Sequence, residues 1–127
     1  MKQIIHTHLA PKAIGSYSQA VKAGNTVFIS GQIPLVPDTM ELVSEGIEAQ
    51  IEQTFKNLAQ ITKAAGGHLE DIVKLTVYLI DLQHFSKVNE SMAKFFDEPY
   101  PARVLIGVNQ LPKQAQVEID AIMVLSD

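Results

Sequence analysis

The hydrophobic period changes along the chain, and this change limits the fold more than any other sequence feature. From about Glu45 to Ala65, apolar residues recur at steps of three and four, which is the spacing of one helical face. These residues are Ile47, Ile51, Phe55, Leu58, Ile61 and Ala65. We expect Ser44 to cap this helix and Gly66-Gly67 to end it. A second helix is expected from about Leu82 to Phe96, with Phe85, Val88, Met92 and Phe95 on its inner side.

The other segments have the character of short strands. Strands are predicted at Tyr17–Lys22, Thr26–Ser30, Ile72–Ile80, Arg103–Val108 and Gln116–Leu125, with another near Ile4. Gly24-Asn25, between the first two, is typical of a hairpin turn. Pro34 and Pro37-Asp38 predict a loop. The order predicts an α+β fold, one domain over residues 1–127, in which both helices cover one face of a mixed sheet.

The two C-terminal strands predict that the other sheet face is uncovered. On the last strand, Val117, Ile119, Ala121 and Met123 alternate with Glu118, Asp120, Ile122 and Val124. On the preceding strand, we expect Val104, Ile106 and Val108 to face the helices, and Arg103, Leu105 and Gly107 to face away. Nothing in the chain remains to cover the second face. A second copy is the natural cover, so we expect a homo-oligomer with functional groups near the subunit contact.

Arg103 and Glu118 are the residues of greatest chemical interest on that face. Burying an arginine is costly unless an anion pairs with it. One interpretation is a structural salt bridge from Arg103 to Glu118 or Asp120, within the chain or across a subunit boundary. The other is a site in which Arg103 holds a substrate carboxylate through two hydrogen bonds while Glu118 positions a water. The residue pattern alone leaves both open.

Composition and missing motifs exclude several classes of site. The chain has no cysteine, and no cysteine nucleophile or thiolate metal site is possible. His6 and His8 lack a third ligand nearby, so no metal is expected. No phosphate or dinucleotide glycine motif is present, and no cofactor is expected. The net charge of −4 argues against nucleic acid as a partner, and no apolar run is long enough for a membrane. We expect a cytoplasmic protein.

Five segments together resemble the RidA/YjgF family over nearly the whole chain. They are AIGSYSQAV (13–21), FISGQIP (28–34), AAGGHLEDIVKLTVYLID (64–81), FSKVNESMAKFF (85–96) and YPARVLIGVNQLPKQAQVEIDAIMV (100–124). The last is similar to the C-terminal signature of the family, with its Pro-Ala-Arg, Leu-Pro and Val-Glu-Ile-acidic-Ala-Ile pieces at matching spacing.

This resemblance implies a chorismate-mutase-like fold, a homotrimer and active sites in clefts between subunits. It also implies hydrolysis of reactive 2-imino or enamine acids to 2-keto acids and ammonia, as in 2-iminobutanoate/2-iminopropanoate deaminases. Arg103 would hold the substrate carboxylate and Glu118 would orient or activate the water. The remaining family positions that line the cleft match Tyr17, Ser30, Gly31 and Asn89.

The chain departs from the family pattern at three positions. Leu105 stands where cysteine or threonine is frequent, Val104 where serine or threonine is frequent, and Ser16 where proline is frequent. Leu105 shares a strand face with Arg103, so it is expected to contact substrate and affect selectivity. Two alternatives to the deaminase remain: a module that binds a small carboxylate without turnover, and an endoribonuclease or translation inhibitor. Glu118 favours the enzyme over the binding module, and the acidic composition disfavours the ribonuclease.

Overall fold

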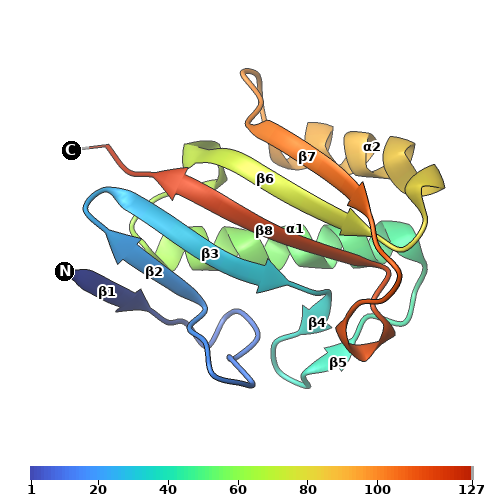
Figure 1. Cartoon of the computed structure of the whole chain (residues 1–127), viewed down its shortest axis with the longest axis horizontal. Coiled ribbons are helices and arrows are strands. Elements are labelled where there is room, and N and C mark those ends of the chain that lie inside the picture. The colour runs from blue at the N-terminus through green and yellow to red at the C-terminus, as the bar shows by residue number, and fades with distance from the viewer. Residues whose placement is uncertain (127) are drawn as a thin grey trace.

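The computed structural model describes residues 1–126 and contains a six-stranded mixed sheet with two helices on one face (Figure 1). The strands are β1 (Lys2–Ile5), β2 (Ala20–Ala23), β3 (Thr26–Gln32), β6 (Ile72–Leu79), β7 (Ala102–Gly107) and β8 (Val117–Val124). Their order across the sheet is β1-β2-β3-β8-β6-β7. Only β6 and β7 pair in parallel, joined through the second helix. The predicted α+β fold is confirmed.

The region predicted as a loop around Pro34 contains a small hairpin instead. It consists of β4 (Leu35–Val36) and β5 (Glu41–Leu42), which pair antiparallel. Met40 has a φ of 59°, which lets the chain reverse just before β5. The hairpin predicted at Gly24-Asn25 is confirmed: Ala23 pairs with Thr26, and Gly24 has a φ of 62°.

Helix α1 (Ile47–Ala64) covers the middle of the sheet, over β3 and β8. Its predicted apolar face is buried, and Ile51, Phe55, Leu58 and Ile61 are fully enclosed. The Gly66-Gly67 end is confirmed. Gly66 has a φ of 97°, and the N–H groups of Gly66 and Gly67 donate to the carbonyls of Lys63 and Thr62, as in a Schellman end. The Ser44 cap is wrong: Gly46 is the N-cap and has no side chain to accept a hydrogen bond from the first N–H groups of the helix.

Helix α2 (Phe85–Phe95) follows a short 3₁₀ turn at Leu82–His84 and lies beside β7. Val88 and Met92 are buried as predicted, and the Phe95 ring lies 5.3 Å from that of Phe55. Phe85 was expected on the inner side but is 49% exposed. It is the first residue of α2, and the helix contacts the core only from Val88 onward. Two further 3₁₀ turns lie at Leu69–Asp71 and Pro112–Gln114.

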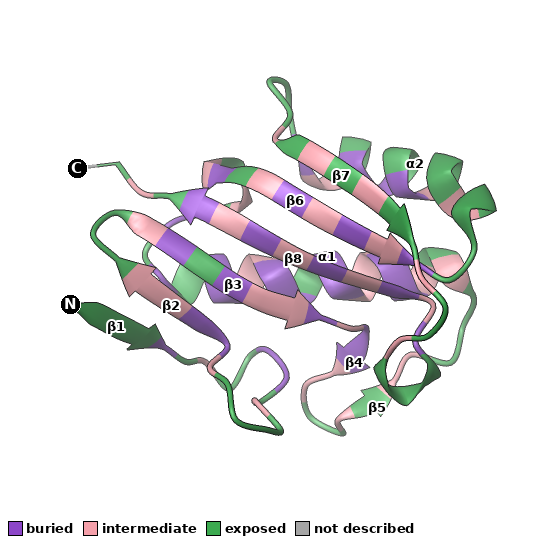
Figure 2. Cartoon of the chain, in the orientation of Figure 1, coloured by how far each residue is buried: buried purple, intermediate pink, exposed green. Residues whose placement is uncertain are grey.

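The sheet has one covered face and one open face (Figure 2). Along β8, the residues predicted to face the helices are buried: Val117, Ile119, Ala121 and Met123. The open face carries partly exposed apolar side chains, including Ile4, Phe28, Val104, Ile106 and Val124. Within residues 1–126, neither helix is long and apolar enough to cross a bilayer.

Candidate functional site

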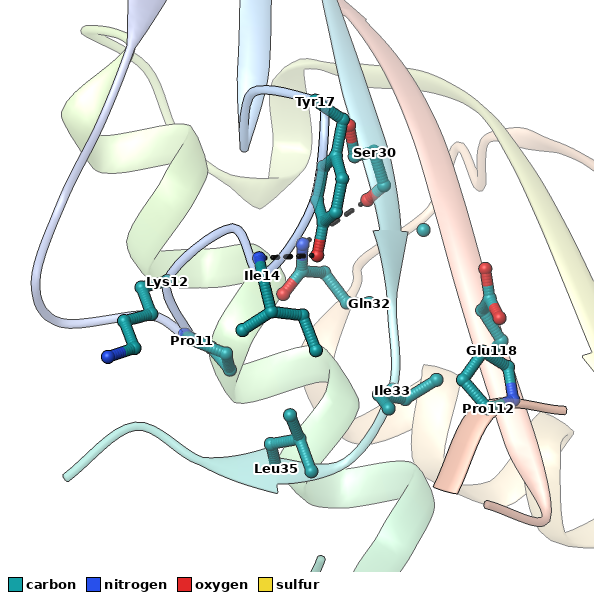
Figure 3. A pocket seen from close by; sticks show the side chains of 11 residues that line it. Pro11, Lys12, Ile14, Tyr17, Ser30, Gln32, Ile33, Leu35, Pro112 and Glu118 are labelled. Atoms are coloured by element: carbon teal, nitrogen blue, oxygen red, sulfur yellow. Dashed lines mark hydrogen bonds between the residues drawn. The ribbon is translucent and has the colours of Figure 1, made fainter. Parts of the chain in front are cut away.

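A cavity of about 400 Å³ opens beside β3 and β8, and we call it the Glu118 cavity (Figure 3). It brings together four of the seven predicted site residues: Tyr17, Ser30, Gly31 and Glu118. Sequence reasoning missed its apolar wall, which consists of Pro11, Ile14, Ile33, Leu35 and Pro112. Lys12 also lines it. A polar floor beside an apolar wall suits a small organic ligand with one reactive polar end.

A bulge in β3 shapes the floor of this cavity. Between Ile29 and Gln32, two β3 residues lie opposite a single position of β8, so the pairing register shifts at Ser30 and Gly31. The Ser30 hydroxyl donates to the Ser18 carbonyl at 2.6 Å, which directs that side chain back toward the preceding loop. Gly31 then lies directly below the Glu118 carboxyl group.

The carboxyl group of Glu118 has no hydrogen bond or ion pair within residues 1–126. Burial raises the pKa of Glu118 above its usual value, because burial disfavours the charged form, and the nearby Asp120 charge raises it further. An uncommitted carboxyl group with a raised pKa is suited to exchanging protons with a bound water or ligand.

The loop that forms the cavity rim is held by Gln19, which sequence reasoning did not identify. This side chain is 2% exposed. Its amide group donates to the carbonyls of Thr7 and Pro11, at 2.9 and 2.8 Å, and its oxygen accepts from the Thr7 N–H at 2.7 Å. A buried polar residue needs such partners, and here they fix the rim beside Tyr17. The Tyr17 hydroxyl in turn accepts from the Ile14 N–H at 3.4 Å.

Arg103 lies in a second cavity, of about 460 Å³, which we call the Arg103 cavity. It is lined by Asn89, Met92, Tyr100, Pro101 and Arg103. The Nη1 of Arg103 donates to Asn89 Oδ1 at 2.7 Å and approaches Met92 Sδ at 3.3 Å. The guanidinium carbon also lies 5.5 Å from the centre of the Phe85 ring. These contacts hold the guanidinium plane while Nε and Nη2 have no acceptor within residues 1–126.

The structure corrects the predicted face of β7. Arg103 and Leu105 pair with the buried Leu75 and Val77 of β6, on the helix side of the sheet. Val104 and Ile106 point to the open face and are 41% and 40% exposed. The prediction failed because β7 is an edge strand with apolar residues on both faces, so hydrophobicity alone could not determine its phase.

On these faces, the predicted site residues fall into two separate groups within one chain. Arg103 and Glu118 lie on opposite faces of the sheet, so the salt bridge that one interpretation placed between them is absent within this subunit, and none to Asp120 is present among residues 1–126. Asn89 accompanies Arg103, whereas Tyr17, Ser30 and Gly31 accompany Glu118. Leu105 lines neither cavity and instead packs against the core.

The proximity of Gly31 to Glu118 supports a first prediction. A Cβ at Gly31 would lie 2.9 Å from Glu118 Cδ, so Gly31→Ala must displace the carboxyl group. The carboxyl group is the far end of a flexible side chain that borders a cavity, so it can turn aside. We therefore expect the free energy of unfolding, measured by urea denaturation, to fall by less than about 1 kcal/mol, with the change confined to the position of the Glu118 carboxyl group. A loss of several kcal/mol would show that the Glu118 side chain cannot move away from residue 31.

Comparison with known proteins gives one consistent result. The model of the endoribonuclease L-PSP family matches residues 7–125. A RutC family protein of Pyrococcus horikoshii is 51% identical over 96% of this chain and 97% of its own length. A Dermatophagoides farinae protein named 2-iminobutanoate/2-iminopropanoate deaminase is 44% identical over 98% of this chain and 97% of its own. The crystal structure of RidA from an Antarctic Psychrobacter is 52% identical and superimposes with a TM-score of 0.94, covering 97% of this chain and 99% of that one.

Proposed function

This chain belongs to the endoribonuclease L-PSP family, which includes RidA proteins, and from that premise we propose that it hydrolyses 2-imino acids to 2-keto acids and ammonia. One observation carries the proposal: a carboxyl group without a hydrogen bond and a guanidinium group with two free nitrogens each line a cavity among residues 1–126. The Dermatophagoides farinae relative, which is named 2-iminobutanoate/2-iminopropanoate deaminase, supports the same reaction.

We further propose that the two cavities meet in a homotrimer, in clefts between subunits. In each cleft, Arg103 and Asn89 from one subunit would face Glu118, Tyr17 and Ser30 from its neighbour. The open sheet face supports this arrangement, because its exposed apolar residues lack any cover among residues 1–126. Closed symmetry would give every subunit one half of two different sites.

In the proposed mechanism, Arg103 binds the substrate carboxylate through Nε and Nη2, the nitrogens that no described residue occupies. A water attacks the carbon of the protonated imine, and Glu118 accepts a proton from this water. Glu118 then gives that proton to the amino group of the tetrahedral intermediate. Glu118 then takes the proton of the hydroxyl group as this becomes the keto group, the C–N bond breaks, and the departing ammonia receives that proton from Glu118 and leaves as ammonium. Fixing the carboxylate relative to the water supplies proximity and orientation, so no covalent nucleophile is needed.

The test of the reaction is the release of ammonia and keto acid from 2-iminobutanoate and 2-iminopropanoate, generated in situ by an amino acid oxidase or dehydratase. We expect the wild-type protein to accelerate hydrolysis above the spontaneous rate. If a folded protein gives no acceleration but binds small carboxylates, the binding-module alternative replaces the enzyme. The name of the family also makes RNA cleavage a necessary control, although the net charge of −4 disfavours an RNA-binding surface.

The shared cleft gives a second prediction that concerns the assembly. Arg103→Ala and Glu118→Gln should each be inactive, but subunits of the two kinds co-expressed and purified through two different tags should recover activity. Every trimer that carries both tags is mixed, and going round such a trimer about one third of the clefts combine an intact Arg103 with an intact Glu118. We therefore expect about one third of the wild-type kcat per site. No recovery in mixed assemblies would show that both groups act within one subunit.

A further inference from the structure

Asp120 is two residues beyond Glu118 on β8, and the period of two places both side chains on the open face. Neither carboxyl group has a cation within ion-pair distance among residues 1–126. Two carboxyl groups at this spacing repel one another when both are ionised, so each affects the proton affinity of the other. The mechanism above uses Glu118 and leaves Asp120 without a role.

Tyr78 makes the two carboxyl groups unequal. It lies on β6 directly opposite Glu118 in the strand register, yet its hydroxyl donates to Asp120 Oδ2 at 3.0 Å. A hydrogen bond donated to a carboxylate stabilises its charged form. Glu118 has no such donor among residues 1–126. The Tyr78 hydroxyl therefore fixes the Asp120 carboxyl group, whereas the Glu118 carboxyl group stays free to exchange protons. This bond, burial and the nearby acidic charges raise the pKa of Tyr78 itself, so the hydroxyl remains a donor at neutral pH.

The surroundings contain few other charges that face Glu118. On β6, the same face carries Tyr78 and Lys74, and Lys74 is four positions from Tyr78, beside Ile122 in the register. The β3 and β7 residues nearest on this face are Ser30, Gly31, Val104 and Ile106, none of which is charged. The cavity rim contributes Lys12 and Tyr17. Lys113, beside Pro112, donates instead to the Met40 carbonyl. Asp120 is therefore the acidic group that acts on Glu118.

We propose that Asp120 is a positioning residue for the deamination: held in place by the Tyr78 hydroxyl on the same face of β8, its carboxyl group keeps Glu118 a strong enough base to take a proton from the attacking water. Asp120 itself touches no reacting atom in this scheme. The proposal rests on the proposed function for its consequence in catalysis. Its electrostatic part concerns the free protein and can be measured without turnover. In the assembled cleft, Arg103 of a neighbouring copy would add a cation near Glu118 in every variant equally.

The test is the titration of the Glu118 carboxyl carbon by ¹³C NMR, with the resonance assigned by its loss in Glu118→Gln. In Asp120→Asn, the negative charge is removed while the amide oxygen can still accept from Tyr78. Loss of a like charge lowers the pKa of Glu118, so the titration midpoint must move to lower pH. Asp120→Glu keeps the charge and should leave the midpoint near that of the wild type. Glu70→Gln, an exposed carboxyl group elsewhere, is the matched control. An unchanged midpoint in Asp120→Asn overturns the proposal.

The role of Tyr78 has a separate readout. In Tyr78→Phe, the Asp120 carboxyl group loses its donor and is free to turn away from Glu118, so the midpoint of the Glu118 resonance should move to lower pH, as in Asp120→Asn. If the Glu118 midpoint stays in place, Tyr78 does not hold Asp120 beside Glu118 and that step is wrong. Native mass spectrometry of each variant confirms that its assembly matches the wild type before titration, because these residues lie on the face proposed for subunit contact.

Kinetics then connect the titration to the reaction. In Asp120→Asn, the acid limb of kcat/KM should move to lower pH together with the Glu118 resonance, because this limb reports the free enzyme. On the plateau, kcat should fall by about 3- to 10-fold, since a weaker base removes less of the proton, while KM changes by less than about twofold. A moved resonance without turnover in any form, wild type included, would refute the deaminase but leave the Asp120–Glu118 coupling in place. A change in KM alone would assign Asp120 to binding.

Discussion

Arg103→Ala is expected to lower kcat/KM for 2-imino acid hydrolysis by about 100- to 1,000-fold. The loss corresponds to about 3 to 4 kcal/mol, the range for removing the charged partner of a carboxylate that binds in a partly enclosed site. Nε and Nη2 of Arg103 have no acceptor within residues 1–126, so their bonds are available to the substrate. Steady-state kinetics at several substrate concentrations give the loss, and unfolding curves give the stability of the variant.

Two further variants test whether the loss comes from the geometry of the guanidinium group and whether it is specific to Arg103. Arg103→Lys keeps the charge but loses the two-pronged geometry, so it should fall between the wild type and alanine. Lys87→Ala removes a cation on α2, whose Nζ lies 3.5 Å from Glu48 Oε1. This variant should leave kcat/KM unchanged. If Arg103→Ala remains folded and fully active, the substrate carboxylate is bound elsewhere, and the Asn89–Arg103 contact is structural.

Glu118→Gln is expected to lower kcat by about 100- to 10,000-fold, the range for losing a positioned acid–base group. Glutamine keeps the shape of the side chain above Gly31 but cannot accept or return the proton at neutral pH. Since Arg103 is untouched, KM should change far less than kcat. The measurement is the initial rate of keto-acid formation across a pH series.

The pH series separates a catalytic role from a structural one. The raised pKa of Glu118 predicts that wild-type kcat/KM falls as the pH drops through this pKa, since the protonated side chain cannot act as a base. Glu118→Gln should lose this limb, and its residual activity should follow the spontaneous reaction. If the variant keeps both its rate and the acid limb, another group activates the water.

The two helices and the β2–β3 hairpin could be predicted from the sequence because local contacts determine them. Contacts at steps of three and four determine which face of α1 is apolar, and Gly66 and Gly24 supply the positive φ values that end the helix and form the turn. The alternation of β8 was also predicted correctly, since its buried set is wholly apolar. The Ser44 cap failed because helix starts depend on one or two residues, and the chain begins α1 after Gly46 instead.

The candidate site depended more on contacts between distant segments. The resemblance to RidA/YjgF proteins identified Arg103 and Glu118 from sequence, but their roles remain predictions. The closeness of Gly31 to Glu118 depends on the β3 bulge, and the rim depends on the buried Gln19. Such contacts join residues that are far apart in the sequence, so no local sequence pattern predicts them.

What the sequence by itself determined is therefore the two helices and the strands of the main sheet, their order and the residues of chemical interest, but not the β4–β5 hairpin. Only the tertiary structure decided that Arg103 and Glu118 lie on opposite faces of the sheet. The reason is that a strand has two possible phases, and a shift of one residue exchanges all its side chains between faces. On β7, an edge strand with apolar residues on both faces, hydrophobicity does not choose between them, and parallel pairing with Leu75 and Val77 does.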